Sequence, residues 1–148
     1  MITVLLILCS SLSGCFSIVK EYAKMQAELD ARFDHYRPLN YIDKDVYSEG
    51  IRDIDEYTRY YYASDISEEL SDAGYKAVSD DEDRQNVISY FETVEAYLND
   101  KSQFDFDYNV ITCDDLYTYF KTTDDSYDTH LFYYDRESCT LYYLIHTT

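Results

Sequence analysis

The chain has 148 residues, enough for one domain with a modest core but too few for two lobes that close around a ligand. Its 30 acidic and 12 basic residues give a formal net charge of -18, and such a surface repels the phosphate backbones of nucleic acids. Because 46% of the residues are hydrophobic and Gly and Pro total only 3 and 1, the composition predicts a folded domain rather than a disordered chain.

An apolar segment followed by a cysteine motif opens the sequence. Ile2 to Leu8 is an unbroken apolar run, and Leu12-Ser13-Gly14-Cys15 follows it. This arrangement resembles the signal peptide and lipobox of bacterial lipoproteins, in which small residues precede the modified Cys. The resemblance implies that residues 1–14 are removed, that Cys15 takes diacylglycerol and usually a further acyl chain such as palmitate, and that the protein lies on the outer side of the cell membrane. Several acyl chains anchor a protein stably, since each buried methylene contributes about 0.8 kcal/mol.

An uncleaved membrane anchor is the alternative interpretation of this segment. No Lys or Arg lies between Met1 and Cys15, although signal peptides usually begin with a positive region, so the natural start could lie upstream. A span from Ile2 to Val19 would just reach the length needed to cross a bilayer, and Lys20 and Lys24 would then favour a cytoplasmic C-terminus. The serines on both sides of the motif disfavour a membrane helix, so we prefer the lipoprotein.

Two helices are predicted at the start of the exported part, which we expect to form a single domain over residues 15–148. Apolar residues recur at helical spacing from Val19 to Phe33, so residues 16–34 are expected to form a tethered amphipathic helix. A second helix is predicted from a cap at Ser48 to a stop at Gly74. Its apolar positions are Ile51, Ile54, Thr58, Tyr61, Tyr62, Ile66, Leu70 and Ala73.

A third helix is predicted after a capping box. Ser79 is expected to cap the first turn together with Glu82, where the acidic run also suits the positive end of the helix dipole. The apolar stripe that follows consists of Val87, Ile88, Phe91, Val94 and Leu98. Because this stripe keeps a regular helical period, we interpret the acidic run as a helix start rather than as a cation site.

The sequence changes to a two-residue period after Lys101, which predicts a sheet. Aromatic and apolar residues alternate with Asp and Asn from Phe104 to Val110. Three further strands are predicted at Leu116–Thr122, His130–Tyr134 and Thr140–His146. The predicted fold class is therefore α+β, with about three N-terminal helices packed on one face of a C-terminal four-stranded antiparallel meander.

The final hairpin carries a second, local resemblance. The order of predicted helices, a Tyr-rich meander and a final hairpin, behind a lipobox, resembles the small uncharacterised lipoproteins found in Gram-positive anaerobes. The local resemblance is strongest at Leu131–Asp135 and Thr140–Tyr143. It supplies neither an activity nor site residues that could be carried over to this chain.

Motifs for metal or cofactor chemistry are missing from the sequence. Asp105, Asp107 and Asn109 imitate the first ligands of a calcium loop, but Val110 and Leu116 stand where Gly and a bidentate Glu are required. No His-containing zinc motif, nucleophile elbow or glycine-rich phosphate loop is present. We therefore predict no metal, no cofactor, no catalytic residues and no nucleic-acid partner.

Two looser groups of polar residues have ordinary structural interpretations. Asp124, Asp125 and Asp128 could gather around an ion, but polar residues between two predicted strands are typical of a turn. His130 and His146 lie on strands that are expected to pair, and we interpret them as a surface pair on the sheet. Neither group predicts a site.

Two cysteines remain in the exported domain if Cys9 leaves with the signal peptide and Cys15 is lipidated. Cys113 and Cys139 are then an even pair outside the cytoplasm, which favours a disulfide. However, they precede the second and fourth strands of the predicted meander, about 10 Å apart, whereas a disulfide needs Cα atoms within roughly 7 Å. The sequence leaves both states open.

The expected function is binding at the membrane surface. The chain contains 19 Tyr and no Trp, and Tyr provides rigid contact area at low entropic cost. We expect a lipid-anchored binding or interaction module that uses its exposed sheet face and the run Tyr60–Tyr62, with an envelope protein or glycan as partner. The alternative is a hydrolase of cell-envelope polymer that uses a carboxylate pair. No recognisable catalytic site supports that alternative, so the sequence favours binding.

The lipobox generates the first testable prediction. In a bacterial host supplied with radiolabelled palmitate, the wild-type protein is expected to take up label and Cys15→Ala to lose it, because only the Cys15 thiol would receive diacylglycerol. Cys15→Ala should accumulate unprocessed or be released from the membrane, whereas the control Cys9→Ala should behave as wild type. An unlabelled wild type, with Cys15→Ala unchanged in size and still membrane-bound, would favour the uncleaved anchor.

Overall fold

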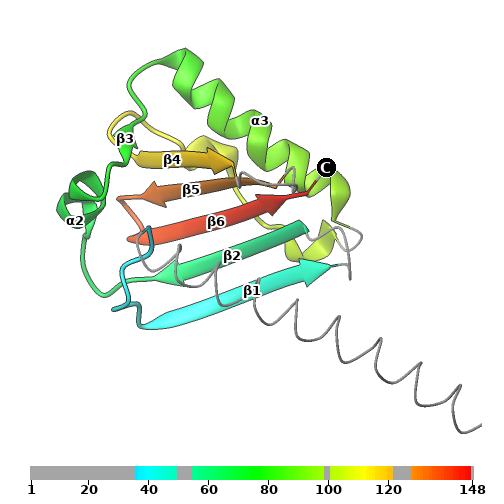
Figure 1. Ribbon diagram of the computed structural model, residues 1–148, viewed down its shortest axis with the longest axis horizontal. Coiled ribbons are helices and arrows are strands. Elements are labelled where there is room, and N and C mark those ends of the chain that lie inside the picture. Colours follow the sequence, from blue (N-terminus) through cyan, green and yellow to red (C-terminus); the bar gives the residue numbers. More distant parts are fainter. Residues whose placement is uncertain (1–35, 50–54, 99–100, 122–127, 148) are drawn as a thin grey trace, which may run out of the picture. The chain divides into compact units, whose positions relative to one another are not determined.

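The computed structural model describes four stretches of the chain, residues 36–49, 55–98, 101–121 and 128–147 (Figure 1). The chain divides into two compact units, Met1–Arg37 and Pro38–Thr148, and the strands and helices named below all lie in the second unit. The predicted signal peptide, Cys15 and the predicted helix over residues 16–34 lie outside the described residues.

The described residues form a six-stranded antiparallel sheet with the order β1-β2-β6-β5-β4-β3. The strands are β1 (Asp43–Glu49), β2 (Asp55–Tyr61), β3 (Lys76–Ala77), β4 (Leu116–Lys121), β5 (Thr129–Asp135) and β6 (Thr140–His146). The meander β4-β5-β6 joins the hairpin β1-β2 through the pairing of β2 with β6, in which Tyr57 lies opposite Leu144. β1 is therefore the outermost strand on one side of the sheet.

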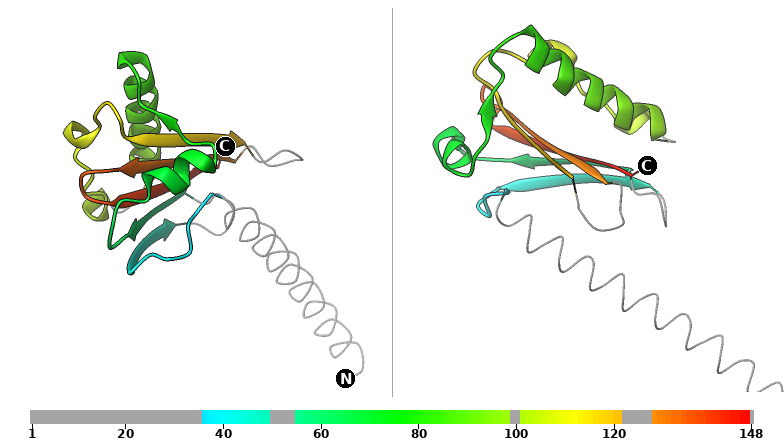
Figure 2. Two further views of the ribbon diagram at one scale, coloured as in Figure 1. Left: turned by 90° about the vertical axis from the view of Figure 1, so that its left-hand side faces the viewer. Right: turned by 45° about the horizontal axis from the view of Figure 1, so that its top comes forward.

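One long helix lies along one face of this sheet. It is α3 (Asp81–Tyr97), and Figure 2 shows it lying over the sheet, with the short helix α2 (Ser67–Asp72) near one end of the strands. Two short 3-10 turns follow α3, η1 (Lys101–Gln103) and η2 (Tyr108–Val110). Gly74, which follows the C-cap of α2, has a φ of +95°, a conformation that Gly adopts without steric cost.

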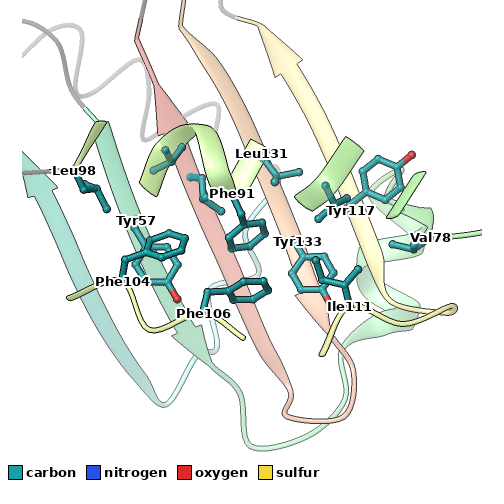
Figure 3. Close-up of a cluster of buried hydrophobic side chains, with 13 residues drawn as sticks. Tyr57, Val78, Phe91, Leu98, Phe104, Phe106, Ile111, Tyr117, Leu131 and Tyr133 are labelled. Atoms are coloured by element: carbon teal, nitrogen blue, oxygen red, sulfur yellow. The ribbon is translucent and has the colours of Figure 1, made fainter. Parts of the chain in front are cut away.

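Six of the 13 buried residues in the core between α3 and the sheet are aromatic, and the others are aliphatic (Figure 3). The ring of Phe91 on α3 stacks on Phe106 with centroids 3.9 Å apart, and it meets Tyr133 of β5 edge-on at 5.8 Å. Tyr57 of β2 packs against Phe104 with centroids 4.9 Å apart. Such aromatic pairs contribute about 0.5–1.5 kcal/mol each beyond their buried area, so Phe91 lies at the centre of the packing.

The predicted fold class is wrong in the N-terminal half of the domain. The described residues form one main helix and six strands, not three helices and a four-stranded meander. The region from Ser48 to Gly74, predicted as the second helix, contains the end of β1, all of β2 and the short α2. Tyr57 and Tyr60 are both buried but point to opposite faces of β2, as the two-residue period of a strand requires. The β-propensity of the Tyr and Thr residues and the pairing with β6 outweigh the helical spacing.

The predicted strand from Phe104 to Val110 is also wrong. This segment is irregular chain and the turn η2, although its side chains alternate as predicted: Phe104 and Phe106 are buried, and Asp105 and Asp107 are exposed. The edge of β4 is occupied instead by β3, where Lys76 lies opposite Tyr117. The two Phe side chains are buried by packing against α3 rather than by strand pairing.

Other predicted elements are confirmed. The third helix is present as α3 with Val87, Phe91 and Val94 buried, and the last three predicted strands correspond to β4, β5 and β6. The predicted cap is one residue off, because Asp80 rather than Ser79 is the N-cap, and its carboxylate accepts from the Asp83 amide at 2.9 Å. The Ser79 hydroxyl donates to the Asp83 carboxylate instead.

The core packing predicts a large effect of truncating Phe91. Phe91→Ala is expected to lower the free energy of unfolding by about 3–5 kcal/mol, because it removes a fully buried ring and leaves a cavity. Urea denaturation followed by far-UV circular dichroism measures the change. The exposed residue Glu92 on the same helix provides the control, and Glu92→Ala should change stability by less than about 0.5 kcal/mol. Equal effects of the two variants would contradict this core.

Candidate interaction surface

Exposed apolar side chains gather where the chain enters the sheet. Leu39 is 65% exposed, Tyr41 36%, Ile42 69% and Val46 48%. All four lie on β1 or in the few residues before it, and we call them the β1 strip. Scattered exposed apolar residues are ordinary, but a group of them at one edge of a sheet is typical of a surface that binds another molecule.

The two faces of β1 differ in chemistry. Alternation along the strand places Ile42, Lys44 and Val46 on one face, and Asp43 and Asp45 on the other. The Lys44 ammonium lies 5.1 Å from the centroid of the Tyr60 ring, which Tyr41 contacts edge-on, also at 5.1 Å. The Asp45 carboxylate instead binds Arg59 and the Tyr61 hydroxyl, at 3.1 and 2.7 Å. One face of the edge strand is therefore mainly apolar and the other is acidic.

Arg59 on β2 organises the acidic face. Its Nη1 donates to Asp105 at 2.7 Å, and its Nη2 donates to Asp45 at 3.1 Å and to the Tyr47 hydroxyl at 2.9 Å. The guanidinium carbon lies between 5.4 and 6.0 Å from the centroids of the rings of Tyr47, Tyr57 and Tyr61. Arg59 thereby connects β1, β2 and the segment after α3. We call this group the Arg59 cluster.

Burial keeps Tyr57 and Tyr61 of the Arg59 cluster protonated. Burial first, and then the hydrogen bond to Asp45, raise the pKa of Tyr61 to about 12. Burial also raises the pKa of Tyr57 well above its usual range. Both phenols therefore remain neutral across the physiological pH range.

Two buried polar atoms of the cluster have no hydrogen-bond partner within the described part of the chain. They are the Tyr57 hydroxyl and Nε of Arg59. Tyr133, equally buried on the same face, differs because its hydroxyl donates to Asp115 at 2.9 Å. A buried polar group without a partner costs about 1–3 kcal/mol, so Tyr57 is held in place by its ring packing and not by its hydroxyl.

The buried carboxylates of the described residues serve the fold. Asp115 accepts from Tyr133 and from the amide of Thr112, and Asp135 accepts from Ser138 in the turn between β5 and β6. A glycosidase needs one carboxyl group whose pKa is raised. The Tyr117 hydroxyl, by contrast, donates to Asp83 at 2.5 Å and lowers the pKa of that carboxyl. The predicted carboxylate pair gains no support from these groups.

The two histidines predicted as a surface pair are buried and do not face one another. His130 lies opposite Ile145 and His146 opposite Thr129, so their side chains point to opposite faces of the sheet. The Nδ1 atom of His130 lies 3.1 Å from the Tyr143 hydroxyl. The Nδ1 atom of His146 lies 2.8 Å from Asp55, and its ring packs against Tyr97 of α3. Both therefore have structural partners.

The other residues singled out from the sequence do not converge. Cys113 is exposed and Cys139 half-buried, and both are free thiols in the structure, so a disulfide in the exported protein stays a prediction. Among the residues of the calcium-like series, Asp105 binds Arg59 and Asp107 caps η2. Asp124 and Asp125 lie outside the described residues. Among the described residues, no group of three or more Asp, Glu, His or Cys side chains is arranged so that it could hold a metal ion.

The tyrosine run that was predicted to bind a partner is mostly buried. Tyr60 and Tyr62 belong to the core, and Tyr61 is half-buried in the Arg59 cluster. Sequence reasoning also missed the β1 strip, because no strand was predicted before the helix that was expected to begin at Ser48. The signal available lay in the neighbouring strand β2, where the alternation Tyr57, Arg59, Tyr61 has the two-residue period of a strand.

Comparisons with known proteins found no match: the chain matches no family model, no curated protein and no solved structure. Within the described ranges, none of the helices has the length and apolar character required to span a bilayer. Functional inference therefore depends on the residues of the surface itself.

The difference between the two buried tyrosines can be tested by removing one oxygen atom from each. Tyr57→Phe is expected to leave the free energy of unfolding unchanged or to raise it by about 1 kcal/mol, because the hydroxyl lost has no partner among the described residues. Tyr133→Phe is expected to lower it by about 1.5–3 kcal/mol, because Asp115 loses a charge-assisted donor. Urea denaturation measures both. Equal losses would show that the Tyr57 hydroxyl has a partner, such as an ordered water.

Proposed function

We propose that the protein is a binding module tethered to the cell membrane through a lipid at Cys15 and facing away from the cytoplasm. Its contact surface is the β1 strip together with the neighbouring acidic face of β1. The partner is another component of the cell envelope. The single observation that carries the binding function is the gathering of Leu39, Tyr41, Ile42 and Val46, all exposed, at the outermost strand of the sheet.

The position of the strip supports recognition rather than catalysis. A reaction site requires a concave region with converging polar groups, whereas the β1 strip lies on the outer strand of the sheet. Apolar side chains with charged neighbours provide contact area and orientation. The membrane address is supported by the lipobox at Leu12 to Cys15, which would keep the module close to partners in the same envelope.

A site-specific photo-crosslinker tests this function in the native cells. With p-benzoylphenylalanine in place of Ile42, irradiation is expected to join the protein to a discrete envelope component, because this side chain is the most exposed of the strip. The same group in place of the exposed Glu92 on α3 should give none of that product. Adding Val46→Asp to the Ile42 probe should reduce the yield several-fold, since a charge in the apolar contact must be desolvated. Identical products from both probes, or none, would refute the proposed function.

A further inference from the structure

The outer edge of β1 is a long backbone edge. All seven residues of β1, Asp43–Glu49, are in register with β2, and no described strand pairs with the other side of β1. At the opposite end of the sheet, the outer strand β3 has only two residues. Because a strand directs its N–H and C=O groups alternately to both neighbours, an outermost strand of this length presents a row of donors and acceptors to an incoming chain.

The side chains beside this edge define which chain would fit. An added strand would place its own side chains alternately beside those of β1. On one face its neighbours would be Ile42 and Val46, which are exposed and apolar, with Lys44 between them over the Tyr60 ring. On the other face they would be Asp43 and Asp45, which are acidic. The Asp45 side chain remains 43% exposed although it binds Arg59, so it is accessible to a further cation.

A second copy of this chain does not fit the edge. An antiparallel pair of β1 strands centred on Lys44 would bring Asp43 of each copy opposite Asp45 of the other, and like charges on neighbouring strands destabilise a sheet. Each copy also carries a formal net charge of -18, which repels the other over a longer range. Charge complementarity therefore favours a cationic partner.

We propose that the outer edge of β1 accepts an extended segment of a cationic envelope protein as an added strand. In that segment Lys or Arg alternates with apolar residues, so that the cations lie beside Asp43 and Asp45 and the apolar side chains beside Ile42 and Val46. Backbone hydrogen bonds provide affinity in this mode of recognition, and the alternation of side chains provides specificity. This inference rests on the proposed binding function and specifies the chemistry of its partner.

Synthetic peptides as long as β1, seven residues, test the inference with the full-length protein in a non-ionic detergent. The first probe alternates Lys and Val. The second has the same composition with the Val residues grouped at one end, and the third is the alternating peptide with every backbone amide N-methylated. Fluorescence anisotropy is expected to show saturable binding of the first probe and at least ten-fold weaker binding of the other two, which carry the same Lys charges but lack the alternation or the amide donors.

Matched charge reversals locate the site. Asp43→Lys is expected to weaken binding of the alternating peptide about five-fold more than Asp72→Lys, because only Asp43 lies beside the added strand. Asp72 is exposed in the last turn of α2, where Lys also suits the helix dipole, so both variants change the net charge equally. Binding should slow hydrogen exchange of amides in β1 but not in α2.

Several outcomes would overturn the inference. Equal binding of the three peptides, or equal effects of the two charge reversals, would show attraction by overall charge alone. If sedimentation velocity shows a dimer that forms with rising concentration, and Asp43→Lys makes this dimer more stable, the edge would be assigned to a second copy of the chain. If the alternating peptide fails to bind while the crosslinker at position 42 still captures an envelope component, strand addition is wrong and the proposed function stands. If neither the peptide nor the crosslinker gives the expected result, both the strand addition and the proposed binding function are wrong.

Discussion

The pairing of β2 with β6 is the contact on which the rest of the sheet depends. Without it, β1 and β2 would be an isolated two-stranded ribbon, which is marginal in water. With it, Tyr57 enters the aromatic core under α3, and Arg59 on the same face comes within hydrogen-bond distance of Asp105 from the segment after the helix. The β1 strip is thus connected to the meander through the single strand β2. The positions of its exposed side chains therefore depend on the register between β2 and β6.

Local patterns in the sequence were sufficient for α3 and for β4, β5 and β6, since the stripe through Phe91 and the alternation of the last strands require no knowledge of distant residues. β2 was mispredicted because its partner β6 is remote in the chain, and β1 was missed with it because β1 pairs with β2. Ile51, Ile54, Thr58 and Tyr61 have helical spacing, and the competing alternation is favoured only when β6 provides an edge to pair with. The segment after Lys101 had the correct period but no partner strand.

The candidate surface was less predictable than the fold. The exposure of Ile42 and Val46 follows from the place of β1 at the end of the strand order, which is a property of the whole topology. A tyrosine run in the sequence likewise cannot distinguish Tyr60, which is buried, from a residue that contacts a partner. The proposed location at the membrane depends on the first fifteen residues alone, so it is independent of the error in the predicted fold class.

Tyrosine hydroxyls bonded to carboxylates recur across the domain and determine how it emits light. Examples are the bonds from Tyr61 to Asp45, Tyr108 to Glu95, Tyr117 to Asp83 and Tyr133 to Asp115. A phenol becomes a much stronger acid in its excited state, so a bonded carboxylate can take the proton before emission. With 19 Tyr and no Trp to collect the energy, we expect the tyrosine fluorescence of the native domain to be partly quenched by the same hydrogen bonds that link its strands and turns.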